Sequence, residues 1–158
     1  MTASAPIRGG TPVTWLEDLP PPEALVVQYL RDWCADASGR ARTMAHATAA
    51  LGEDEAERAL HCWGELINML TRYGQRTLVL NGSKCRSVGS DEAVFAHFVT
   101  TAALGEREEA MLIASLLVRA DLLCPAVHLA QSAGLAIARI ALRAARTAGA
   151  MPPAPTRH

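Results

Sequence analysis

Aromatic side chains are scarce in this sequence: Phe, Trp and Tyr together make up 4% of its 158 residues. β-Sandwiches draw on aromatic and β-branched residues, so this scarcity disfavours them. Half of all residues are hydrophobic, and Ala, Leu and Val are plentiful among them, which favours closely packed helices. A chain of this length builds one ordinary core. We therefore expect an all-α protein with a single domain.

An excess of charge of one sign is also missing. Fifteen Lys and Arg residues face sixteen Asp and Glu residues, for a formal net charge of −1. The whole molecule therefore offers no electrostatic attraction to nucleic acid or to a membrane surface. Neither an uninterrupted signal-peptide run nor a uniformly apolar membrane span is found, because Pro6, Gly9, Gly10 and Pro12 break the amino-terminal stretch. We expect no membrane contact.

The four cysteines do not form a recognisable framework. Cys34, Cys62, Cys85 and Cys124 are widely spaced, so neither a small disulfide scaffold nor a paired metal motif is indicated. Reduced thiols in a cytoplasmic protein are the simplest expectation.

No catalytic, phosphate-binding or metal motif is intact. Glu57, His61 and Glu65 share one face of an expected helix, but a di-iron bundle needs Glu-x-x-His, which does not occur here. A solvated face explains them better. Cys124-Pro125 is the kind of dipeptide whose thiolate binds haem iron in some proteins, although Pro also fits the first turn of a helix. We expect no catalytic residue, metal or cofactor, and haem stays an alternative.

Helical spacing predicts a bundle of five or six helices. Trp33 and Trp63 lie on apolar stripes and should be buried, and residues 106–119 are apolar on nearly all sides and should be central. Residues 1–12 should form a flexible arm, 13–146 the helical domain and 147–158 a disordered tail. The expected helices cover residues 22–37, 41–51, 53–73, 91–104, 106–119 and 124–146.

One long break interrupts the helical pattern. Asn81-Gly82 suits a tight type I′ turn, so Arg76–Leu80 is predicted to pair with Lys84–Val88 as a small β-hairpin inserted near residues 76–88. This hairpin concentrates cations and a thiol, and we take its surface as the candidate binding site. Its residues are Arg72, Arg76, Lys84, Cys85 and Arg86.

These features favour a non-catalytic regulatory or adaptor protein that acts through protein–protein contacts. Two alternatives stay open. One is a sensor of a small molecule, haem included, with a pocket among the helices of residues 91–146. The other is a nucleic-acid-binding regulator that uses the basic hairpin, which the acidic face of the preceding helix disfavours. We also expect a homodimer, with the small residues Ala130, Gly134 and Ala138 at or near its contact.

Overall fold

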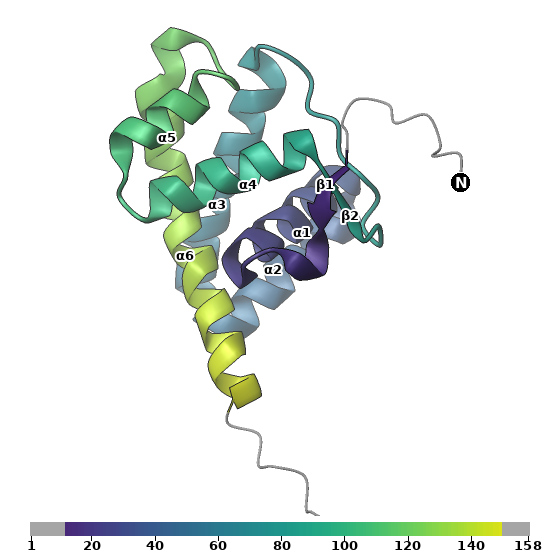
Figure 1. The fold of residues 1–158 in the computed structure, drawn as a ribbon. Helices are drawn as coiled ribbons and strands as arrows, with labels where there is room; N and C mark the ends of the chain where they lie inside the picture. Colours follow the sequence, from purple (N-terminus) through teal and green to yellow (C-terminus); the bar gives the residue numbers. More distant parts are fainter. Residues whose placement is uncertain (1–11, 150–158) are drawn as a thin grey trace, which may run out of the picture.

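The computed structural model describes residues 12–149, and within them the chain forms six α-helices and one two-stranded antiparallel sheet (Figure 1). The all-α class with a small antiparallel pair is thereby confirmed. The helices are α1 (Pro21–Ala35), α2 (Ala37–Leu51), α3 (Glu53–Tyr73), α4 (Ser90–Ala103), α5 (Arg107–Ala114) and α6 (Leu123–Gly149). The strands are β1 (Pro12–Trp15) and β2 (Ser87–Gly89), and short 3₁₀ turns cover Leu16–Asp18 and Ala120–Leu122.

Local sequence explains where the first three helices begin and end. Proline occupies the first positions of α1, where a missing N–H costs nothing. The side chain of Asp36 caps α2 by accepting a 2.7 Å hydrogen bond from the Gly39 N–H. Gly52 then joins α2 to α3 with a φ of +90°, which favours glycine. The sequence predicted one helix end near Ser38, and the break in fact lies at Asp36.

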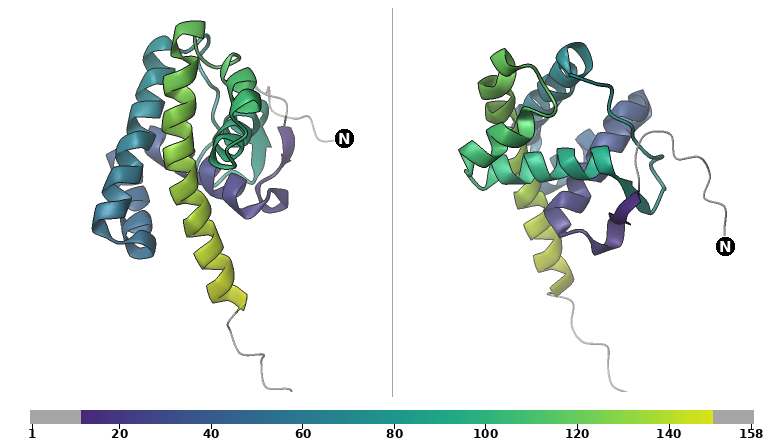
Figure 2. Two further views of the ribbon diagram at one scale, coloured as in Figure 1. Left: turned by 90° about the vertical axis from the view of Figure 1, so that its left-hand side faces the viewer. Right: turned by 45° about the horizontal axis from the view of Figure 1, so that its top comes forward.

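The longest helix, α6, is the centre of the bundle. It packs against all five other helices, and Figure 2 shows it side by side with α3. A Cβ atom on Gly134 would lie 2.7 Å from the backbone oxygen of Val99 in α4. The small-residue row of α6 therefore allows α4 of the same chain to approach. Gly134 therefore lies in a contact within the chain and not in the dimer contact that the sequence suggested for it; the dimer itself stays a prediction.

An edge-to-face series of rings crosses the core and joins four helices. The ring of Tyr29 in α1 contacts both His46 of α2 and Trp63 of α3. Trp63 in turn contacts Phe95 of α4. Such T-shaped contacts place a positive ring edge against a negative ring face. Burial of Trp63 is confirmed. Trp33 is only partly buried, because it lies at the rim of a surface groove described below.

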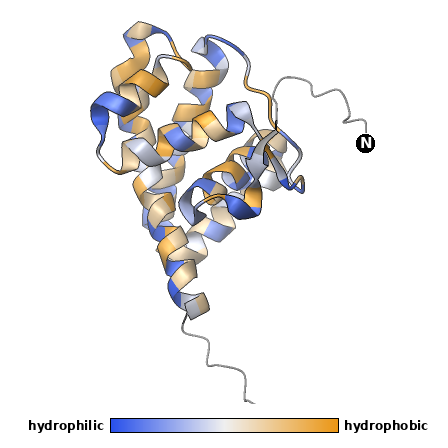
Figure 3. Cartoon of the chain, in the orientation of Figure 1, coloured by the Kyte–Doolittle hydropathy of each residue, from blue (hydrophilic) through white to orange (hydrophobic). Residues whose placement is uncertain are grey.

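The segment expected to be central lies at the periphery. Only Arg107–Ala114 of this segment is an α-helix. Leu112 and Leu116 are 72% and 61% exposed, although Leu117 and Val118 are buried. Figure 3 shows orange, hydrophobic residues in this α5 region at the top of the molecule. The apolar composition of this segment therefore includes leucines at the surface as well as leucines in the core. Periodicity alone does not distinguish the two.

The strand pairing predicted for the hairpin is wrong. Residues 76–80 form no strand pair with residues 84–88. Instead β2 pairs with β1, with Trp15 opposite Ser87, so the partner strand comes from the start of the described chain and not from residues 76–80. Gly82 has no positive φ, which excludes a type I′ turn at Asn81-Gly82. The observed turn covers residues 82–85, where the Cys85 N–H donates to the Gly82 carbonyl at 2.9 Å.

Among residues 12–149, one helix is long and apolar enough to pass a test of length and composition for a membrane span; the sequence pattern did not single it out. It covers Ala120–Gly149, with a mean hydropathy of 1.2 over its most apolar window. Its packing against the other five helices gives a sufficient reason for that composition, because a helix at the centre of a bundle is apolar on several sides. The helix continues to Gly149, past the predicted end at Arg146. The remaining residues of the predicted tail and the arm up to residue 11 lie outside the described residues.

Candidate functional site

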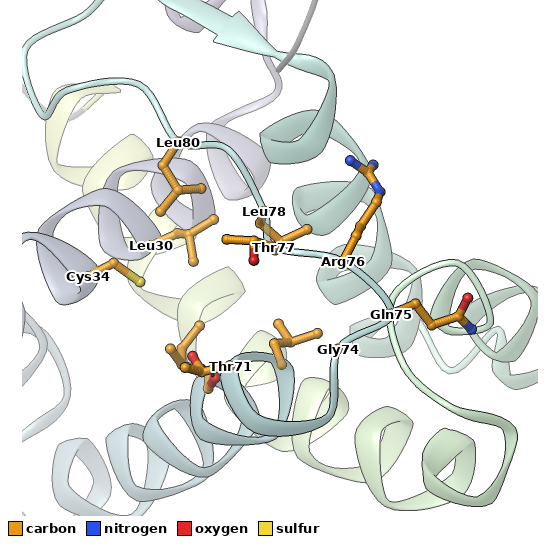
Figure 4. A pocket seen from close by; sticks show the side chains of 11 residues that line it. Leu30, Cys34, Thr71, Gly74, Gln75, Arg76, Thr77, Leu78 and Leu80 are labelled. Carbon is orange, nitrogen blue, oxygen red and sulfur yellow. Dashed lines mark hydrogen bonds between the residues drawn. The ribbon is translucent and has the colours of Figure 1, made fainter. Parts of the chain in front are cut away.

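A hollow of about 480 Å³ opens on the surface between α1, α3 and the segment that leaves α3 (Figure 4). Its volume is in the range of binding pockets for small ligands or inserted side chains. Apolar side chains dominate its walls, and Cys34 and Thr71 contribute a thiol and a hydroxyl. The apolar wall residues are Leu30 of α1, Ile67 and Leu70 of α3, and Leu78 and Leu80 of the segment.

A second hollow, of about 460 Å³, continues along the same two helices. The two share Cys34, Ile67 and Thr71, so we treat them as one depression, the α1–α3 groove. At its far end the Arg40 guanidinium lies 5.6 Å from the ring centroid of Trp33, which is a cation–π distance. A Cβ atom on Gly64 would lie 3.2 Å from that ring, so a glycine there lets the indole lie close to α3.

The segment of residues 74–89, which joins α3 to α4, is fixed by a buried ion pair. The side chains of Arg31 and Glu92 are both 0% exposed, and the Arg31 Nε lies 2.6 Å from a Glu92 oxygen. A second nitrogen of Arg31 donates to Glu92 at 2.9 Å, which makes the pair bidentate. Two further N–H groups of Arg31 donate to the carbonyl oxygens of Cys85 at 2.6 Å and Ser87 at 2.7 Å. One side chain of α1 thus holds both α4 and the 74–89 segment.

A second buried carboxylate holds the first half of that segment. Asp91 accepts a 2.8 Å hydrogen bond from the Val79 N–H and also binds the guanidinium of Arg76. The Asn81 N–H donates to Glu92 at 3.3 Å. At the start of the segment, the Gln75 side chain donates to two carbonyl oxygens of residues 115 and 118. These contacts keep residues 75–81 beside the groove.

Two of the four predicted cations are paired with carboxylates. Arg76 binds Asp91, and Arg86 makes two 2.7 Å hydrogen bonds to Glu17. Lys84 and Arg72 are exposed, and within residues 12–149 neither has a carboxylate within ion-pair distance. Of the four predicted cations, only Arg76 lines the first hollow of the groove. The structure therefore does not gather them into one basic surface.

Cys34, which lines the groove, and Cys85 of the 74–89 segment have pKa values shifted in opposite directions. The Cys85 sulfur lies 3.2 Å from the hydroxyl oxygen of Ser87, and hydrogen bonding to Ser87 lowers the pKa of the Cys85 thiol. Burial raises the pKa of the Cys34 thiol, against a smaller opposite effect of the Arg40 charge. Cys85 therefore carries the more readily ionised thiol, although no base stands beside it in the hydrogen-bond pattern of the described residues.

Sequence reasoning missed the residues that fix this site. In the sequence, Arg31 falls among the polar residues of its helix, and Asp91 and Glu92 fall in the first turn of α4, where the positive end of the helix dipole alone would account for them. All three are buried. Arg31 and Glu92 are 61 positions apart, and a single sequence gives no sign of that pairing. The capping role of Glu92 is real, since it accepts the Gly89 N–H at 3.0 Å, but it is only part of the residue's function.

The residues weighed for a metal or haem site are all exposed. Glu57, His61 and Glu65 are exposed as predicted. No group of three or more His, Cys, Asp or Glu side chains in the described part of the chain is arranged to hold a metal ion. Cys124 and His128 are both exposed, and neither lines the α1–α3 groove.

Comparison of the chain with protein-family models, with curated proteins and with solved structures gives no match in any of the three. The arguments for function accordingly rest on the groove and the segment beside it.

Proposed function

We propose that the protein is a non-catalytic binding protein that acts through protein–protein contact, with the α1–α3 groove and the adjoining 74–89 segment as its recognition surface. The observation that carries this proposal is the preformed groove itself. Its apolar walls stand open at the surface, and the buried Arg31–Glu92 pair holds the 74–89 segment in place. A surface already fixed before binding loses less conformational entropy when a partner docks.

The chemistry of the groove resembles that of a protein interface. Leucine and isoleucine form its apolar centre, and Thr71, Thr77 and Gln75 are polar residues along it, which matches the apolar core and polar rim of such interfaces. Trp33 and Arg40 stack at one end. Tryptophan and arginine are enriched among the residues that dominate binding energy.

A small-molecule function is the second candidate, because the first hollow alone is large enough for a ligand. That hollow lies between α1 and α3, and not among the helices of residues 91–146 where the sequence suggested a pocket. Nucleic-acid binding is the weaker alternative, since Arg76 and Arg86 already neutralise carboxylates and phosphate contacts depend on free cations.

A photo-crosslinking experiment tests the proposal. A photoreactive residue replaces Thr77, which is exposed beside the groove, and in a control it replaces the exposed Glu108 of α5. Irradiation of cells that make the full chain should give a discrete polypeptide adduct at position 77 and none at position 108. The adduct should disappear when Trp33→Ala is added. A native mass spectrum that shows a co-purifying small molecule, together with no polypeptide adduct at position 77, contradicts the proposal and supports the second candidate.

A further inference from the structure

Residues 77–80, Thr-Leu-Val-Leu, have a strand-forming sequence and yet pair with no strand among residues 12–149. One edge of this short stretch is occupied. The Val79 N–H donates to Asp91 and the Asn81 N–H donates to Glu92. In an extended chain, alternate residues direct their N–H groups to the same side. The α4 carboxylates therefore take the place of a neighbouring strand on that side.

The other edge is free. Within the described residues, the backbone N–H and C=O groups of Leu78 and Leu80 have no hydrogen-bond partner. By the same alternation, these groups point away from the side that α4 occupies. An unpaired strand edge of this kind is ready to pair with another extended chain.

The free edge lies beside the first hollow of the groove. Leu78 and Leu80 both line that hollow, and Figure 4 shows them above Thr71 of α3, with Leu30 and Cys34 of α1 beside them. In peptide recognition by strand addition, backbone hydrogen bonds provide affinity and a pocket for alternate side chains provides specificity. Both requirements are met here by neighbouring atoms.

We propose that residues 77–80 bind an extended peptide segment of a partner protein by strand addition, with an apolar side chain of that segment inserted into the hollow. This inference rests on the proposed function and names its binding mode. An amphipathic helix satisfies its own backbone groups, and so would leave the Leu78 and Leu80 groups unpaired. An apolar small molecule has few groups to pair with them. An extended peptide is the occupant that uses both the edge and the hollow.

The test begins with a displayed library of short random peptides, selected on the purified full-length protein. Each backbone N–H of the selected peptide is then methylated in turn. Strand addition predicts an alternating pattern, in which every second methylation weakens binding about tenfold, because each blocked group loses one backbone hydrogen bond. Replacing the peptide's anchoring apolar residue with Asp should abolish binding.

A pair of protein variants provides the matched control. Leu80→Pro removes the N–H from the free edge and keeps an extended backbone, whereas Leu80→Val keeps the N–H and a similar apolar side chain. Binding should be lost in the first and retained in the second, with both variants folded by circular dichroism. Since the methylation series needs no protein variant, it still decides the question if Leu80→Pro fails to fold.

Three results overturn the inference. They are a selected peptide with no alternating pattern, a library that yields no binder, and a wild-type protein that pairs this edge with a second copy of itself. Failure of the inference is distinguishable from failure of the proposed function. A position-77 crosslink to a partner, without the alternating pattern, leaves the proposed function standing and removes only the strand mode.

Discussion

Arg31 and Glu92 form a fully buried ion pair that also makes hydrogen bonds to backbone groups on either side. Two charges taken out of water are stable only when such partners compensate them. Removing either Arg31 or Glu92 would leave the other as a buried charge without a counter-ion. The position of the 74–89 segment beside the groove therefore depends on two side chains that never contact a ligand.

We predict that Glu92→Gln lowers the free energy of unfolding by about 3–5 kcal/mol, because it leaves the Arg31 charge buried without a counter-ion. Urea unfolding followed by circular dichroism measures the change. Glu17→Gln is the control, since it breaks the exposed Arg86 pair and should leave the midpoint nearly unchanged. Equal effects of the two substitutions would show that the buried pair does not hold the segment.

The two shifted thiols give a prediction about pH. The lowered pKa of Cys85 predicts that its alkylation by iodoacetamide accelerates at a lower pH than that of Cys34, whose pKa is raised. Ser87→Ala removes the hydrogen bond and should move the Cys85 profile to higher pH. Mass spectrometry of the labelled peptides resolves both sites, and coincident profiles for Cys34 and Cys85 would contradict the assignment.

At the scale of elements, periodicity predicted most helices well because their apolar stripes are real buried faces. The spacing of Ala56, Leu60 and Trp63 predicted α3 from Glu53 to Tyr73, as observed. The same reasoning wrongly placed residues 106–119 at the centre. A run of leucines does not indicate which of them other elements will bury. Strand pairing between 76–80 and 84–88 was wrong for a different reason. Carboxylates of α4 occupy the edge that the hairpin needed.

The packing of α6 on α4 predicts the effect of a small substitution. Gly134→Ala should lower the free energy of unfolding by about 1–3 kcal/mol despite the better helix propensity of alanine, because its Cβ would lie 2.7 Å from the Val99 backbone oxygen. Gly149→Ala on the same helix meets no neighbour and should change stability little. A thermal melt of the two variants compares them directly. A neutral Gly134→Ala would contradict the close approach of the two helices.

For the molecule as a whole, the sequence and the structure draw attention to the same break in the helical pattern, but they give it different surroundings. The predicted break near residues 76–88 supplies only part of the groove, through Arg76, Leu78 and Leu80. Cationic side chains do not dominate it, since tertiary pairing neutralises Arg76 and Arg86. The groove also needs α1, whose Leu30 and Cys34 a local motif search does not connect to residue 80. The two-fold dimer stays a prediction, now without Gly134 as its contact.

Amide hydrogen exchange of the free protein, resolved residue by residue by NMR, tests the central claim most directly. The claim is that residues 77–80 form an extended stretch held on one edge and open on the other. It predicts slow exchange at Val79, whose N–H donates to Asp91, and fast exchange at Leu78 and Leu80. Equal protection at all three amides would mean that the second edge is already paired. Uniformly fast exchange would mean that the carboxylates of α4 do not hold the segment. Either result contradicts the account.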